Sequence, residues 1–128
     1  MARTVDFSVT IRESSRELSP KEKVMMKDIS NAVKLDSACE NEAIVIYPAF
    51  HVILDVHNSK SDNPDYTNYV IVDKEGKKYV TGSPSFWNAY SDIMSEMYEV
   101  DDDSWGLEVY KLDSKNYSGK KFLTCSII

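Results

Sequence analysis

The sequence predicts a mainly β protein built as one small antiparallel barrel, and three observations lead to this prediction. First, 128 residues with 42% hydrophobic and 28% charged side chains suit a single globular domain with one core. Second, five or six segments carry the alternating or β-branched pattern of strands. Third, one strongly amphipathic segment predicts a helix before the last two strands. We expect a closed or partly open barrel of five or six strands, with an αβ sandwich as the rival architecture.

Residues 1–32 are expected to add a strand and a short helix to this domain. The stretch Val5–Ile11 alternates apolar and polar residues, which is the period of a half-buried strand. A helix is predicted to start after Ser19, because serine caps a helix and Pro20 suits the first helical position. Glu22 completes the pattern of a capping box.

The centre of the sequence is expected to hold its strongest strands. Ala43–Val56 is the most apolar stretch, and Pro48 within it cannot donate a ladder hydrogen bond, so we expect a bulge or bend there. Tyr66–Val72 is predicted as a second strand. A tight turn follows it, in which Gly76 is free to take a positive φ, and Lys77–Thr81 is predicted to return as the partner strand.

The clearest helix is predicted to begin at Ser83 and Pro84, which provide a cap and a first helical residue. An apolar stripe with the 3–4 spacing of one helix face follows: Phe86, Tyr90, Ile93 and Met97. We interpret this stripe as core packing. Trp105–Leu112 and Lys121–Ile127 are predicted as the last two strands. Because a helix between strand pairs is typical of the oligonucleotide-binding (OB) barrel, residues 33–128 are expected to form an OB-like barrel.

Few side chains in the sequence point to catalysis or to metal binding. No serine has the setting of a nucleophile elbow, and the four scattered glycines form no phosphate loop. His51, Asp55 and His57 share one strand face, but the two histidines stand about 20 Å apart on an extended strand, too far for one ion. Cys39 and Cys125 are expected to be buried thiols rather than a disulfide. We therefore predict no enzyme, no metal and no cofactor.

The net charge of −6 argues against general binding of polyanions, although the charge is unevenly distributed. Residues 1–36 hold seven basic and six acidic residues, whereas residues 37–110 hold four and fourteen. Residues 111–128 hold four basic residues and one acidic residue. A small basic region therefore follows a strongly acidic one. The acidic stretch 99–103 lacks the spaced oxygen ligands of a calcium loop and is interpreted as a solvated loop.

Aromatic residues interleaved with lysine form the most informative pattern in the sequence. The segment Tyr110–Phe122 holds four lysines, three aromatic residues and one acidic residue. A second patch with this composition lies at the predicted hairpin tip: Lys74, Lys77, Lys78 and Tyr79. Exposed rings on strands stack on unpaired bases, and lysine neutralises the phosphates between them. Composition alone favours a plainer interpretation, in which the lysines form solvated turns and the tyrosines fill the core.

A series of strand, turn and helix features runs through residues 33–128 in a recurring order. These features are Asn68–Val72, Asp73–Gly76, Lys77–Tyr79, Ser83, Asp92, Leu107–Val109, Ser114–Lys115, Gly119–Lys120, Phe122 and Ile128. Their order resembles that of the small single-stranded-DNA-binding proteins of protein-primed phages and related mobile elements. Residues 1–32 have no counterpart in that pattern.

The resemblance implies an OB-like barrel that coats single-stranded DNA during replication or recombination, without sequence preference. It also implies that aromatic and basic residues on one barrel face contact the DNA: Tyr66, Tyr69, Lys77, Tyr79, Tyr110, Lys111, Lys115 and Lys121. In this interpretation two or three tyrosines stack bases and the lysines hold phosphates. The acidic middle of this sequence departs from a simple basic groove, so stacking has to supply much of the affinity.

The sequence leaves one alternative function open, an acidic protein-interaction module or an inhibitor that mimics nucleic acid, with Asp101–Asp103 as its contact residues. Edge strands of a small barrel offer a route to a homodimer. No run of about 18 apolar residues exists, so we expect no membrane partner. Residues 1–10 lack the apolar core of a signal peptide, and a cytoplasmic protein is expected, in the host cytoplasm if it is phage-encoded.

Overall fold

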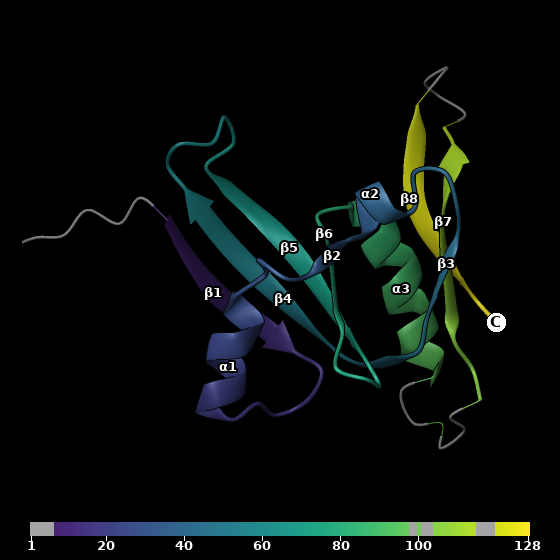
Figure 1. The fold of residues 1–128 in the computed structure, drawn as a ribbon, viewed down its shortest axis with the longest axis horizontal. Helices are drawn as coiled ribbons and strands as arrows, with labels where there is room; N and C mark the ends of the chain where they lie inside the picture. Colours follow the sequence, from purple (N-terminus) through teal and green to yellow (C-terminus); the bar gives the residue numbers. More distant parts are fainter. Residues whose placement is uncertain (1–6, 98–99, 101–103, 115–119) are drawn as a thin grey trace, which may run out of the picture.

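The computed structural model describes residues 7–97, 100, 104–114 and 120–128, which form eight strands and three helices (Figure 1). A large sheet has the strand order β1, β4, β5, β6, β2, and a small sheet has the order β3, β7, β8. The large sheet consists of β1 Phe7–Ser14, β2 Val33–Lys34, β4 Pro48–Asn58, β5 Asp65–Asp73 and β6 Lys78–Thr81. The small sheet consists of β3 Ile44–Ile46, β7 Leu107–Asp113 and β8 Lys121–Ile127. The helices are α1 Pro20–Lys27, α2 Leu35–Ala38 and α3 Pro84–Met97.

The prediction of a mainly β fold is confirmed, but the strands form two sheets that are not closed into a single OB-like barrel. The reason lies at Pro48, where the long apolar segment is divided as its sequence predicts. Before Pro48, β3 pairs with β7 of the small sheet, and after it β4 pairs with β1 and β5 of the large sheet. A register shift between Pro48 and Phe50 marks the bend. One segment thus supplies a strand to each sheet.

One face of the large sheet packs against α1. Four alternate side chains of β4 are buried on this face: Phe50, Val52, Leu54 and Val56. Met26 of α1 packs against them. The predicted helix start is confirmed, because Ser19 and Glu22 form a reciprocal capping box. The hydrogen bond that Arg16 donates to Glu22, with a smaller contribution from the Ser19 amide, lowers the pKa of Glu22 to about 2.

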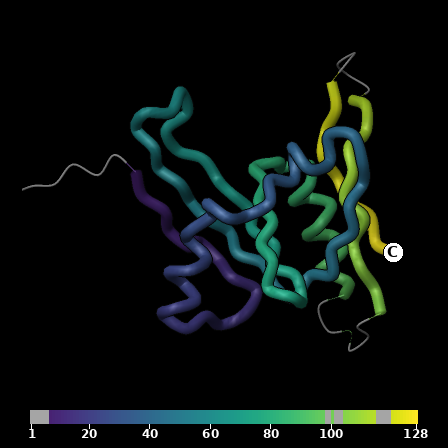
Figure 2. The backbone as a smooth tube through the Cα atoms, viewed as in Figure 1, coloured from purple at the N-terminus to yellow at the C-terminus, as the bar shows by residue number. Residues whose placement is uncertain are grey.

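A second core lies between the two sheets and centres on α3. Phe86 and Tyr90 are fully buried there, in contact with residues of both sheets. The predicted apolar stripe of this helix therefore serves as core packing. Figure 2 shows the resulting path of the chain, with β1 and α1 at one end of the molecule, β7 and β8 at the other, and α3 between them.

Both cysteines lie in this second core as free, buried thiols, as the sequence predicts. Burial raises the pKa of Cys39 and raises that of Cys125 to about 12. The Cys39 thiol donates a hydrogen bond of 3.5 Å to the carbonyl oxygen of Val109. Both thiols are therefore protonated at neutral pH, and they contribute to packing as small apolar groups.

The turn between β5 and β6 holds the lysines of the predicted hairpin tip. The Asp73 carboxylate accepts hydrogen bonds from the backbone N–H groups of Glu75 and Lys77, at 2.9 and 2.8 Å. Gly76 has a φ of 88°, the left-handed conformation predicted for it. The turn is therefore well determined, and it presents Lys74 and Lys77 to solvent beside the small sheet.

Candidate nucleic-acid interface

The small sheet packs only one of its faces against α3. Ile46, Leu107 and Val109 point to that side and are buried in the second core. Because side chains alternate along a strand, the residues between them point to the opposite side, which we call the outer face. The strand register arranges its residues in four rows: Tyr47, Gly106 and Ile128; Val45, Glu108 and Ser126; Tyr110 and Thr124; Leu112 and Phe122.

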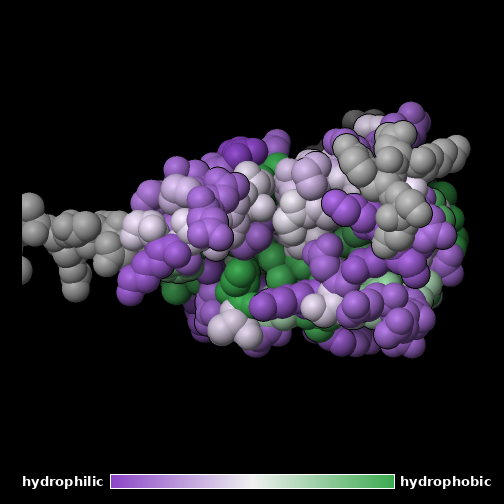
Figure 3. All heavy atoms as spheres, turned by 90° about the horizontal axis from the view of Figure 1, so that it is seen from above, coloured by the Kyte–Doolittle hydropathy of each residue, from purple (hydrophilic) through white to green (hydrophobic). Residues whose placement is uncertain are grey.

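Large apolar side chains on the outer face are open to solvent. Tyr47 is 48% exposed and Phe122 is 37% exposed. Val45, Leu112 and Ile128 are exposed to a similar or greater extent. Figure 3 shows hydrophobic residues at the surface in the middle of the molecule and also at its small-sheet end, whereas the opposite end of the large sheet is mainly hydrophilic. Exposed apolar patches of this kind mark sites of interaction.

The ring of Tyr47 lies close to the backbone of Gly106. A Cβ atom at Gly106 would come within 2.8 Å of the Tyr47 ring, so only glycine leaves room for this placement. Gly106 is itself fixed by two backbone hydrogen bonds to Ile128, of 3.1 and 2.9 Å. The position of Tyr47 at the end of the outer face is therefore determined by the backbone of β7 and β8.

Tyr110 and Phe122 lie toward the other end of the outer face, in neighbouring rows. Tyr110 lies opposite Thr124, and Phe122 lies opposite Leu112, so the two residues are diagonal neighbours in the register. The Tyr110 hydroxyl shares a hydrogen bond of 2.5 Å with the hydroxyl of Ser126. This bond holds the half-buried ring in place along the sheet.

Two hollows that contain lysines border the small sheet, one near each end. Lys74 and Lys77 lie beside Tyr47 of the outer face. Lys111 and Lys121 have the same parity as buried Val109 and Leu123, so they point to the α3 side of their strands. At the Tyr47 end, a hollow of about 430 Å³ is lined by Val45, Tyr47, Asp73, Lys74, Glu75, Lys77 and Tyr79. At the Tyr110 end, a hollow of about 320 Å³ is lined by Cys39, Glu40, Asn41, Glu42, Ala43, Tyr110, Lys111 and Lys121. Each hollow therefore combines two lysines with two acidic residues, and neither is strongly basic.

Five of the eight residues that the resemblance places at the DNA line the two hollows, which lie at different ends of the small sheet. Tyr110, Lys111 and Lys121 line one hollow, and Lys77 and Tyr79 line the other. Lys115 lies outside the described residues.

The three other tyrosines of the expected set, Tyr66, Tyr69 and Tyr79, lie on strands of the large sheet. Tyr79 is only 7% exposed in the second core, where burial raises its pKa, so its ring is not open for stacking on a base. Tyr69 is stacked on Trp87 of α3, with ring centroids 4.5 Å apart. Tyr66 packs against the other core, beneath α1. The expected set of tyrosines on one concave face is therefore not present in this structure, and its members serve packing instead.

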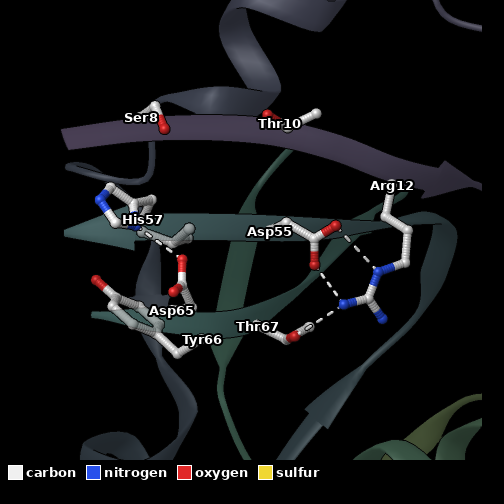
Figure 4. A pocket seen from close by; sticks show the side chains of 9 residues that line it. Ser8, Thr10, Arg12, Asp55, His57, Asp65, Tyr66 and Thr67 are labelled. Atoms are coloured by element: carbon white, nitrogen blue, oxygen red, sulfur yellow. Dashed lines mark hydrogen bonds and ion pairs between the residues drawn. The ribbon is translucent and has the colours of Figure 1, made fainter. Parts of the chain in front are cut away.

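A polar surface on the large sheet is the other open face of the molecule (Figure 4). Arg12 forms an ion pair with Asp55 and donates a hydrogen bond of 3.1 Å to the Thr67 hydroxyl. His57 is bonded to Asp65 at 2.8 Å. The charged groups of this open polar face therefore bond to one another.

The three residues considered as metal ligands, His51, Asp55 and His57, each form a hydrogen bond or ion pair with a different side chain. Asp55 is bonded to Arg12 and His57 to Asp65, while the Nδ1 atom of His51 lies 2.9 Å from the Tyr90 hydroxyl. Within the described ranges, no cluster of three or more metal-ligating side chains occurs. Burial lowers the pKa of His51, and the charge of Glu13 opposes this shift.

Sequence reasoning did not select Tyr47 and Phe122, although both carry signals in the sequence. Tyr47 directly precedes the strand-breaking proline and has the same parity as exposed Val45. Phe122 ends the segment of interleaved lysines and aromatic residues. Alternation of side chains along the strands distinguishes Tyr47 and Phe122 from their buried neighbours in the sequence, since adjacent residues point to opposite faces of the sheet.

Comparison with known proteins gives no match, since no family model, no curated protein and no solved structure is significantly similar to this chain. No helix among the described residues is both long enough and apolar enough to cross a membrane.

Proposed function

We propose that this protein binds single-stranded DNA without sequence preference, through the outer face of the small sheet. One observation carries the proposal: Tyr47 and Phe122 are exposed at opposite ends of a sheet face that no described element covers, with Tyr110 between them and two lysines at the Tyr47 end. Flat rings on a strand surface stack on unpaired bases whatever their identity, because every base has a π-face. In a duplex these faces are already stacked on neighbouring bases, so the proposed site selects single strands.

The charge of the protein makes stacking the main source of affinity in this proposal. The net charge is −6, and Glu108 lies within the outer face itself. Lys74 and Lys77 contact phosphates at the Tyr47 end of the bound segment, while the rings of the outer face contact bases. Since few phosphates are neutralised, affinity falls with salt along a shallow slope.

The order of sequence features supports the same proposal. It resembles that of the single-stranded-DNA-binding proteins of protein-primed phages and mobile elements, and on that basis we propose a role in replication or recombination. The OB-like architecture implied by that resemblance belongs to this proposal as well. In this proposal the strands of an OB-like barrel correspond to the strands of the two sheets, which are connected through the bend at Pro48.

A titration of a fluorescein-labelled oligo-dT with the protein, followed by anisotropy, tests the proposal. We expect saturable binding at low salt, and weaker binding to a duplex of the same length. Phe122→Ala is expected to weaken binding roughly 5- to 150-fold, the range for loss of one stacked base. The matched control is Tyr66→Ala, which removes a partly buried tyrosine from the large sheet and leaves affinity unchanged. Absence of saturable binding by folded protein would refute the proposal.

A protein partner is the second candidate for the outer face. Glu108 at its centre and the acidic residues in both hollows favour this alternative, since they repel phosphates and attract basic groups. The acidic contact residues first considered for such a module, Asp101–Asp103, lie outside the described residues. In the titration above, this alternative predicts no binding of DNA at any salt concentration.

A further inference from the structure

The sheet edges of this molecule differ in how far they are covered. On β8, Leu123 and Cys125 are only 2% and 6% exposed, and the Ser85 hydroxyl of α3 donates a hydrogen bond to the Leu123 carbonyl oxygen. Helix α3 therefore covers the middle of β8, at the edge of the small sheet. On β1, at the edge of the large sheet, Thr10 is exposed and Val9 is only half-buried. No described residue pairs with the outer side of β1.

The strand register shows which backbone groups of β1 point outward. The Ser15 N–H donates to the His51 carbonyl oxygen at 3.0 Å, so the odd-numbered residues of β4 direct their backbone groups toward β1. Ser8 and Thr10 lie opposite such residues and use their own backbone groups in that pairing. Hydrogen bonding alternates along an antiparallel pair, so three other residues direct their N–H and C=O groups to the open edge: Phe7, Val9 and Ile11.

The sequence of this edge lacks the features that normally prevent strand addition. Residues 7–11 read Phe-Ser-Val-Thr-Ile, with no charged residue and no proline. Phe7 is 57% exposed at one end of the segment. At the other end, a register shift between Ile11 and Glu13 interrupts the regular strand. The open edge is therefore a neutral, β-prone segment of five residues.

We propose that a second copy of this chain pairs with β1 in antiparallel orientation, with Val9 of each copy opposite the other. In this register Phe7 lies opposite Ile11 of the second copy, and Ser8 lies opposite its Thr10. Apolar residues thus meet apolar residues on the α1 side, and hydroxyl groups meet on the open polar face. The two large sheets join into one continuous sheet of ten strands.

Charge and exposure favour a second copy over another partner, and they favour this register. No like charges meet within residues 7–11, and the pairing covers Phe7 in each copy. A shift by one residue in one direction sets Arg12 against Phe7, which desolvates a charge against an aromatic ring. A shift in the other direction leaves Ile11 without a partner among the described residues.

Cysteine cross-linking tests this register directly. Val9→Cys places two thiols opposite each other, at the Cα separation of about 5.5 Å that suits a disulfide. Ile11→Cys is the matched control, because it lies on the same side of the same strand while the two copies of residue 11 stand about 13 Å apart. Under mild oxidation we expect a covalent dimer from Val9→Cys and none from Ile11→Cys. Equal cross-linking of the two variants, or none of either, would overturn the proposed register.

Sedimentation analysis of the unmodified protein tests the dimer itself. We expect a species of twice the 14.6 kDa chain mass that dissociates on dilution. Phe7→Asp sets a charge against Ile11 of the second copy and is expected to yield a monomer, with a circular dichroism spectrum like that of the parent. A parent protein that stays monomeric at every concentration refutes the proposal. Binding of DNA is a separate measurement, so failure here leaves the proposed function intact.

Discussion

The two solvent-exposed sheet faces of this molecule differ in the side chains that they present to water. On the large sheet, the open polar face carries hydroxyl and charged groups that bond to one another, such as Arg12 with Asp55 and His57 with Asp65. On the small sheet, the outer face carries exposed rings and aliphatic side chains around a single acidic residue, Glu108. Both faces are formed by antiparallel strand pairs, which tolerate water on one side.

The difference bears on which of the two faces is the better candidate for binding a partner. A polar face with satisfied hydrogen bonds is stable in water, and a ligand there would have to replace bonds that already exist. An apolar face gains free energy when it is covered, at about 25 cal/mol for each Å² removed from water. The outer face of the small sheet is therefore the surface on which binding is favoured.

The largest effect is expected from removing both exposed rings of the outer face at once. The double substitution Tyr47→Ser and Phe122→Ser removes two stacking contacts, which are worth about 1–3 kcal/mol each, so binding of oligo-dT is expected to fall below detection. The matched control is Thr10→Ala with Thr67→Ala on the open polar face, which leaves anisotropy titrations unchanged. If the two double variants bind alike, the comparison between the faces is wrong.

A smaller effect is expected from Gly106→Ala. The new methyl group displaces the Tyr47 ring from its place against the backbone. The affinity for oligo-dT is therefore expected to fall, by no more than it falls in the Tyr47→Ala variant. In a Tyr47→Ala background the same change has no further effect on binding, because the ring that it displaces is absent. Anisotropy titrations of the four proteins form a double-mutant cycle, and additive losses would contradict this relation.

A pH dependence of stability is expected from His51, at the inner border of the open polar face. Burial lowers the pKa of His51 below the ordinary value of 6.5. The imidazole of His51 therefore binds a proton more readily in the unfolded chain than in the native protein. The free energy of unfolding is therefore highest above pH 6.5 and falls as the pH drops toward the lower native pKa. Urea denaturation of the protein and of His51→Phe checks this, with a flatter profile expected for the variant. Identical profiles would assign the dependence to other groups.

The smallest effect is expected from Arg12→Ala on the open polar face. Both partners of the ion pair with Asp55 are about half exposed, so its loss is expected to change the free energy of unfolding by only about 0–1 kcal/mol. Binding of oligo-dT is expected to stay within error of the parent protein. A marked loss of affinity would show that the open polar face takes part in binding.

Local features of the fold could be predicted from the sequence because they depend on neighbouring residues. The capping box at Ser19 and Glu22, the bend at Pro48 and the positive φ of Gly76 are each determined within a few residues. The division into two sheets was not predicted, since it depends on which distant strands β3 and β4 select as partners on either side of the bend.

The candidate site could be predicted only in part for a similar reason. Tyrosine is apolar enough to fill a core and polar enough to remain exposed, so composition does not separate Tyr79, which is buried, from Tyr47, which is open. Tyr79 and Tyr47 differ in whether a helix covers the face of the sheet to which each side chain points. Tyr69 faces α3 and stacks on Trp87, whereas no described element covers the side to which Tyr47 points.

An NMR titration of the isotope-labelled protein with oligo-dT tests most directly which face binds. We predict that amide shifts change at Val45, Glu108, Tyr110 and Phe122, and that those of Thr10, Asp55 and Thr67 stay in place. Changes confined to the large sheet, or no change anywhere at saturating DNA, would contradict binding at the exposed rings of the small sheet.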